Sequence, residues 1–190
     1  MARSRFGQDT ALGRAPKLDN AIFLTLMHLH TPLKYKAWAD RRTLDAVARI
    51  DREIHVAQFD FARQQLNHMV RVEELFRARL TEGAEPHDST NTPELPLLEA
   101  LASRLSASNQ WLQDYAQALH PDHFQQRIHF TFVDGKKGTM SREEVLYHLI
   151  NHGTYHRGAI GHALDLANAP RPADTFTVFI HATEPDRREA

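Results

Sequence analysis

Thirteen histidines and no cysteine make histidine the side chain with the most chemical potential in this chain of 190 residues. Imidazole is the commonest metal ligand, and its pKa lies nearest to neutral pH. The absence of cysteine excludes disulfide bonds, cysteine-ligated zinc, iron–sulfur clusters and a cysteine nucleophile. The first question is therefore whether some of the histidines converge on one metal ion.

Three of the histidines follow one another at intervals of four residues near the C-terminal end of the chain: His148, His152 and His156. Side chains four residues apart lie on the same side of a helix, so His152 and His156 can both reach one metal ion. They also occupy core-facing positions in a series of residues at helical spacing. The series is Val145, Leu149, His152, His156, Ile160 and Ala163. Buried imidazoles need partners for their nitrogen atoms, which a metal ion or paired carboxylates would supply.

A third ligand is available on an earlier segment. His68 lies next to Met69 in the segment 56–80, whose apolar residues recur at helical spacing. If this helix faces the later one, His68 projects toward His152 and His156. Three ligands from two helices leave coordination positions for water or substrate, as in catalytic zinc sites. The alternative for each residue is a hydrogen-bonded histidine of the core.

Three further residues are candidates for roles beside a metal ion. Glu73 interrupts the apolar stripe of its helix and is a candidate general base, the alternative being a solvated residue or an ion pair with Arg77. His148 is a second candidate base, or a hydrogen-bond partner of the metal ligands. Arg157 can bind an anionic group of a substrate, or it can fix its helix through an ion pair.

The elements that must position these residues are four predicted helices. Helical spacing of apolar residues predicts them over 33–50, 56–80, 96–119 and 141–166. Four helices of this length favour an all-α fold, a four-helix bundle, in which metal sites lie between facing helices.

Local signals predict several of the boundaries. Thr31-Pro32 has the pattern of an N-cap followed by a first helical residue, and Ser141 to Glu144 has the S-x-x-E pattern of a capping box. Alternating residues before Asp134-Gly135 predict a short β-hairpin over 127–139, just before the last helix. The alternation around Phe176–Ile180 predicts an extended segment after that helix.

Composition and charge narrow the remaining classes. With 42% hydrophobic and 25% charged residues, we expect a single domain over 21–182, preceded by an arm at 1–20 and followed by a polar tail at 183–190. A net charge of -1 argues against nucleic acid or an anionic membrane as a partner, although Arg41-Arg42 and the arm are locally basic. Without an apolar run long enough to cross a membrane or a signal-peptide pattern, the cytoplasm is the expected location.

Two motifs resemble those of the DinB/YfiT-like family. They are Leu66-Asn67-His68 and the stretch 151–158, where the family pattern is N-H-x-x-x-H-R-G-Q and Ala159 stands in place of the glutamine. Segments 35–40, 130–139 and 170–174 resemble the family's first helix, hairpin and C-terminal tail. The resemblance covers roughly residues 30–180.

This resemblance implies His68, His152 and His156 as a metal triad, in a bundle of up-down-down-up connectivity that forms homodimers. It implies a divalent metal such as zinc, nickel or iron, and some branches of the family transfer or isomerise substrates with a low-molecular-weight thiol. We therefore expect a metal-dependent enzyme in which the metal activates a small thiol or water toward a small-molecule substrate. The alternative is a non-catalytic metal-binding bundle with a structural, sensing or oligomerisation role.

Overall fold

The computed structural model describes residues 20–188, with side chains from residue 29 onward, so nearly all of the predicted arm at 1–20 lies outside it. The described part is mostly helical with one small antiparallel sheet, and none of its helices is long and apolar enough to cross a membrane. The α-helices and strands, in chain order, are α1 (Asn20–Val47), α2 (Val56–Leu80), α3 (Leu98–Ala118), β1 (Arg127–Thr131), β2 (Lys137–Ser141), α4 (Arg142–Leu166) and α5 (Phe176–Thr183).

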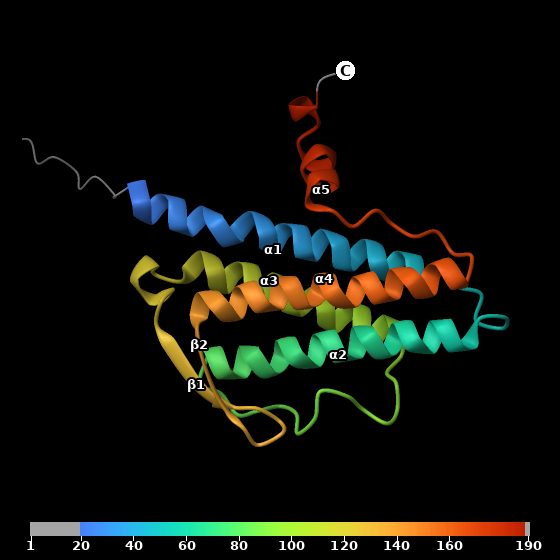
Figure 1. Cartoon of the computed structure of the whole chain (residues 1–190), viewed down its shortest axis with the longest axis horizontal. Coiled ribbons are helices and arrows are strands. Elements are labelled where there is room, and N and C mark those ends of the chain that lie inside the picture. Colours follow the sequence, from blue (N-terminus) through green and yellow to red (C-terminus); the bar gives the residue numbers. More distant parts are fainter. Residues whose placement is uncertain (1–19, 189–190) are drawn as a thin grey trace, which may run out of the picture.

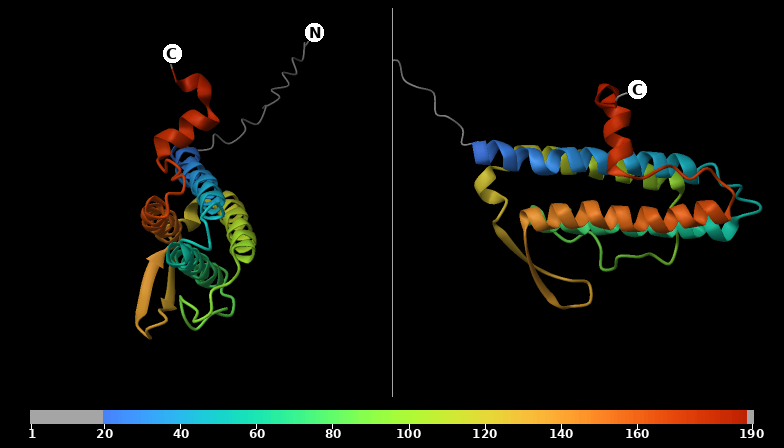
Figure 2. Two further views of the ribbon diagram at one scale, coloured as in Figure 1. Left: turned by 90° about the vertical axis from the view of Figure 1, so that its right-hand side faces the viewer. Right: turned by 45° about the horizontal axis from the view of Figure 1, so that its top comes forward.

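The four long helices lie side by side (Figures 1 and 2). α2 packs against α4 and α3, and α1 packs against α3 and α4. α1 and α4 run one way along the long axis and α2 and α3 run the other way, so the loop 81–97 returns along the molecule to the start of α3 (Figure 1). One apolar cluster, which includes Phe76 and Leu146, lies toward the hairpin; another, which includes Leu66 and Ile160, lies toward the α1–α2 turn. The pairing of α2 with α4 is the feature that positions the histidines.

The local signals of the last helix and of the hairpin are confirmed. The Ser141 hydroxyl accepts a hydrogen bond from the Glu144 backbone N–H at 3.1 Å, and the Ser141 N–H donates to the Glu144 carboxylate at 2.7 Å. The strands pair antiparallel, and Gly135 in the turn between them has a φ of 84°. This left-handed conformation favours glycine, which explains the strength of the Asp-Gly signal.

The predicted start of the first helix is wrong. α1 begins at Asn20 and continues through Pro32 instead of starting there. A proline inside a helix removes one backbone hydrogen bond and crowds the preceding turn, at a cost of about 3 kcal/mol. Leu29 and Leu33, which flank Pro32, are both buried in the same core cluster. Packing on both sides of the proline therefore keeps the helix continuous.

The predicted extended segment around residue 178 is also wrong, because residues 176–183 form helix α5. Thr175 caps this helix by accepting a hydrogen bond from the Val178 N–H at 3.4 Å. Phe176 and Phe179 lie on one side, with ring centroids 5.5 and 5.9 Å from that of Tyr35 on α1. Alternation over five residues fits either conformation, and the contacts with α1 favour the helix.

Candidate metal centre

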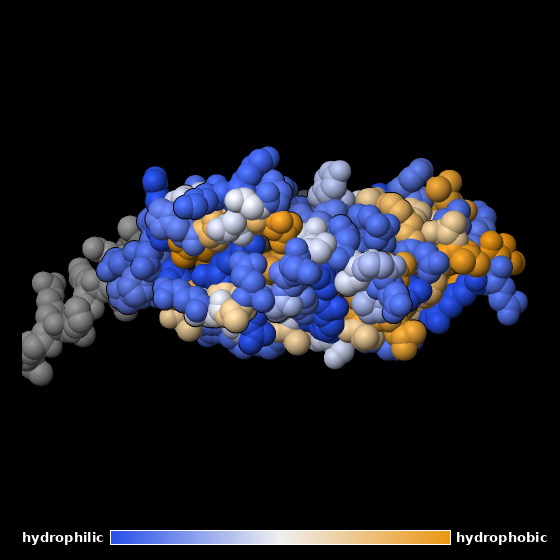
Figure 3. Space-filling view, turned by 90° about the horizontal axis from the view of Figure 1, so that it is seen from below, coloured by the Kyte–Doolittle hydropathy of each residue, from blue (hydrophilic) through white to orange (hydrophobic). Residues whose placement is uncertain are grey.

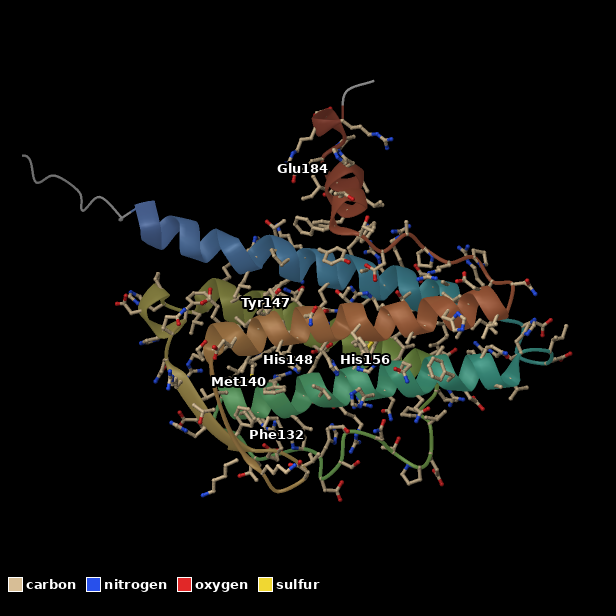
Figure 4. All side chains as sticks on the ribbon, viewed as in Figure 1. Phe132, Met140, Tyr147, His148, His156 and Glu184 are labelled. Atoms are coloured by element: carbon tan, nitrogen blue, oxygen red, sulfur yellow. The ribbon has the colours of Figure 1, made fainter. Side chains whose placement is uncertain are left out.

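α2 and α4 bring His68, His152 and His156 together, as the sequence predicts. The Nε2 atom of His152 lies 3.2 Å from that of His68 and 3.0 Å from that of His156. One ring nitrogen from each residue falls within a group less than 4.8 Å across. Figure 4 shows His156, together with His148, on the side of α4 that faces α2. The three predicted ligands thus form one cluster, which we call the histidine triad.

The nitrogen chemistry of the triad fits a metal ion. An Nε2 atom carries either one hydrogen or one lone pair, so that of His152 cannot make a full hydrogen bond to both neighbours. A metal ion accepts all three lone pairs. Ligand atoms about 2.1 Å from a tetrahedral metal ion are about 3.4 Å apart, close to the two spacings observed. The donor set therefore suits one divalent ion better than a network of hydrogen bonds among histidines.

Two protein groups orient the outer sides of the rings. His156 Nδ1 lies 2.6 Å from the Gln65 side-chain oxygen, so that the ring N–H donates to the amide and Nε2 keeps its lone pair. His68 donates a hydrogen bond to the backbone carbonyl of Thr90, in the loop 81–97. Such contacts fix the tautomer and orientation of metal-binding histidines. Sequence reasoning missed both partners, since only the fold brings them to the rings.

The electrostatics keep the triad uncharged at neutral pH. Burial, reinforced by the neighbouring imidazoles, lowers the pKa of His152 to about 3. Burial, followed by the charge of His68, lowers the pKa of His156 to about 4. Burial also lowers the pKa of His68. Because only neutral imidazole ligates a metal, the three lone pairs are available without the release of a proton.

Replacing Gln65 with alanine is expected to weaken zinc binding by about 10- to 100-fold, the range found when partners of metal ligands are removed. The variant leaves the His156 N–H without its acceptor and frees the ring to rotate. Competition with a chromogenic chelator measures the effect. Gln64→Ala, one residue away and exposed, is the control, and equal affinities for the two variants would contradict the prediction.

His148 lies beside the triad but is not one of its three clustered residues. Its ring centroid is 5.3 Å from that of His152 and 5.3 Å from that of Phe76 on α2. Burial lowers the pKa of His148, which keeps its imidazole neutral at pH 7. The role of His148 as a base stays a prediction. The residue lies one helical turn before His152, a candidate ligand.

For Glu73, both alternatives weighed against catalysis are wrong. The side chain is buried, and its carboxylate pairs with Lys36 of α1 at 2.7 Å and accepts a hydrogen bond from Ser108 of α3 at 2.5 Å. It is therefore neither solvated nor paired with Arg77. Burial raises the pKa of Glu73 despite the nearby ammonium group. Glu73 stands in the apolar stripe of α2 because its carboxylate makes an ionic contact with α1. No local sequence pattern predicts that contact.

Arg157 is also buried in ionic contacts. Its Nη1 donates to Asp40 of α1 at 2.8 Å, and its Nε donates to Asp174 at 2.8 Å. We call the group Lys36, Asp40, Glu73, Arg157 and Asp174 the buried charge network. A substrate anion would have to displace one of these carboxylates to reach the guanidinium. The geometry matches an ion pair that fixes the helix, and anion binding by Arg157 stays a prediction.

Comparison with known proteins identifies the family of this chain. A model of the DinB family matches residues 25–188, which includes all four long helices except the first turns of α1. A search of curated proteins and a search of solved structures each gave no match. The family match covers most of the chain and contains the whole histidine triad. On this basis, the chain belongs to the DinB family.

Proposed function

We propose that this chain is a divalent-metal-dependent enzyme of the thiol S-transferase type, built on an up-down-down-up four-helix bundle. The observation that carries the proposal is the convergence of three imidazoles from α2 and α4, with one ring nitrogen of each within 4.8 Å of the others. Three neutral imidazoles suit zinc, nickel or iron. Three protein ligands would leave coordination positions for a thiol, water or substrate.

A metal ion at this site would lower the pKa of a bound thiol or water enough to give a thiolate or hydroxide near neutral pH. The chain supplies the rest. Gln65 and Thr90 hold two of the rings in their ligating orientation. In this proposal, His148, one turn before His152, would accept the proton that the thiol or water gives up; its ring centroid lies 5.3 Å from that of His152. The thiol must come from solution as a small molecule, because the chain has no cysteine.

The wider setting is proposed from the family resemblance and the charge balance. We expect a small-molecule substrate, a homodimer and a cytoplasmic location. Nucleic acid is not a proposed partner, since the net charge of -1 gives no overall electrostatic attraction to phosphate.

Elemental analysis of tag-free protein, with thermal melts before and after metal addition, tests the proposal. We expect one zinc, nickel or iron per chain and thiol transfer to electrophiles that requires both metal and thiol. Bound metal and a higher melting temperature, without turnover for any thiol or water, would favour the structural or sensing role. Protein that holds no metal and gains no stability from zinc or nickel would contradict both functions.

A further inference from the structure

An apolar cavity of about 330 Å³ reaches the histidine triad from the side of the hairpin. His152 and His148 are both among its lining residues. Val72 and Phe76 of α2 contribute to its walls, and Phe132 lies on the hairpin side. A molecule in this cavity would touch a metal ligand directly. Its volume is at the lower end of the range for small-molecule sites, which suits a single aryl or branched-alkyl group.

Arg79, the charged residue among those lining this cavity, already has hydrogen-bond partners. Arg79 donates to Glu85 at 2.6 and 3.1 Å and to the Thr131 carbonyl at 3.0 Å. Its guanidinium also lies over the ring of Phe76, 5.1 Å from the centroid. A charged substituent entering the cavity would lose its hydration without gaining a free counter-charge, which is costly. The cavity therefore selects uncharged, apolar groups.

The hairpin loop places apolar side chains at the mouth of the cavity. Phe132 and Val133 are 42% and 46% exposed. The Phe132 ring packs edge-on against Phe130, and a Cβ atom at position 138 would lie 2.6 Å from it, so Gly138 provides the space that the ring uses. Figure 4 shows Phe132 and Met140 on the hairpin side of α2. The exposed apolar side chains of Phe132 and Val133 form part of the cavity wall, and an apolar ligand would cover them.

A second cavity of about 800 Å³ shares two lining residues, His148 and Met140, with the first. Its lining includes Glu143, Tyr147 and Asn151, and it is accordingly more polar. The apolar part of a substrate is thus favoured in the smaller cavity, which also contains His152. The larger cavity is the competing location that an experiment must separate.

We propose that the smaller cavity is the specificity pocket of the site, and that the substrate carries an uncharged aryl or branched-alkyl group beside its reacting atom. This inference rests on the proposed function, because the metal centre supplies the reactive partner. It adds a substrate class that neither the family match nor the triad itself assigns.

The test compares imidazole with 4-phenylimidazole as ligands of the cobalt-loaded protein, followed by visible absorption. We expect the phenyl group to tighten binding at least tenfold. Val133→Glu, at an exposed position where folding is not at risk, should reduce that advantage below threefold and leave the affinity for imidazole unchanged. Val72→Phe, which fills the cavity from α2, should do the same. Val56→Glu is the matched control, since Val56 is 53% exposed at the start of α2. Figure 3 shows apolar surface at this end of the molecule, which is the end away from the hairpin.

With the cobalt-loaded protein, two outcomes would overturn the inference: no phenyl advantage in the wild type, or an advantage removed by Tyr147→Ala in the larger cavity but not by Val133→Glu. Failure of the metal centre is seen separately, as the absence of any cobalt spectrum or of a response to imidazole. The pocket is then tested on the metal-free chain with 2-naphthol, an uncharged aryl probe, by saturation-transfer NMR. Binding that Val133→Glu abolishes supports the pocket without the metal, and absence of binding overturns it.

Discussion

Replacing His152 with alanine is expected to reduce the metal content from one ion per chain to nearly none, and to lower zinc affinity more than 100-fold. His152 is the central member of the triad, because its Nε2 lies within 3.2 Å of both other Nε2 atoms. Its loss leaves two ligands where stable zinc sites use three or four protein ligands. Losing a ligand should cost more than losing a partner of a ligand, for which the range is about 10- to 100-fold. Elemental analysis measures the metal content, chelator competition measures the zinc affinity, and far-ultraviolet circular dichroism shows whether the helical fold is kept.

His148→Ala is the matched control for this variant. His148 lies four residues earlier on the same face of α4, is likewise half-buried, and is outside the triad. It should keep its metal, while any thiol-transfer activity falls if it accepts the proton. Equal metal loss in both variants, or full metal retention in His152→Ala, would contradict the assignment of ligands. Metal loss accompanied by unfolding would show that the metal is needed for the fold.

Arg157→Ala is expected to lower the free energy of unfolding by about 3–5 kcal/mol, the usual effect of removing one partner of a buried ion pair. Arg157 is 3% exposed and Asp40 is 1% exposed. Although burial opposes the charged form, Lys36 and Arg157 hold the pKa of Asp40 below its ordinary value. Removing the guanidinium leaves that buried carboxylate with one cation instead of two and frees Asp174 from α4. Urea denaturation followed by circular dichroism gives the change.

Arg187→Ala is the control for the loss of an arginine ion pair. Its Nη1 lies 3.3 Å from Glu184, and the two side chains are 58% and 54% exposed. Solvent screens such pairs, so its loss should cost less than about 1 kcal/mol. If the two variants lost similar stability, the buried charge network would not be holding α4 to α1. We expect metal affinity to stay unchanged in Arg157→Ala, which would separate the role of the network from that of the histidine triad.

Local patterns predicted the parts of this molecule that depend on neighbours in the sequence. The periodicity of 56–80 matches the bounds of α2, and the Ser141 capping box marks the start of α4, because both signals arise within one or two helical turns. The predictions at Pro32 and for the segment after Thr175 are wrong because the structure there depends on contacts with other elements. In each, packing between elements outweighs a local preference: Leu29 and Leu33 in the core, and Phe179 against Tyr35.

The site divides in the same way. The sequence alone determined that His152 and His156 share one helix face, and it provided His68 on a second helix, because helical spacing and residue type are local properties. Only the tertiary structure decided that α2 faces α4 and that the three Nε2 atoms meet. It also decided that Glu73 pairs with Lys36, across 37 residues of sequence, and that His152 lines an apolar cavity. Such contacts depend on which helix faces pack together, and no single segment carries that information.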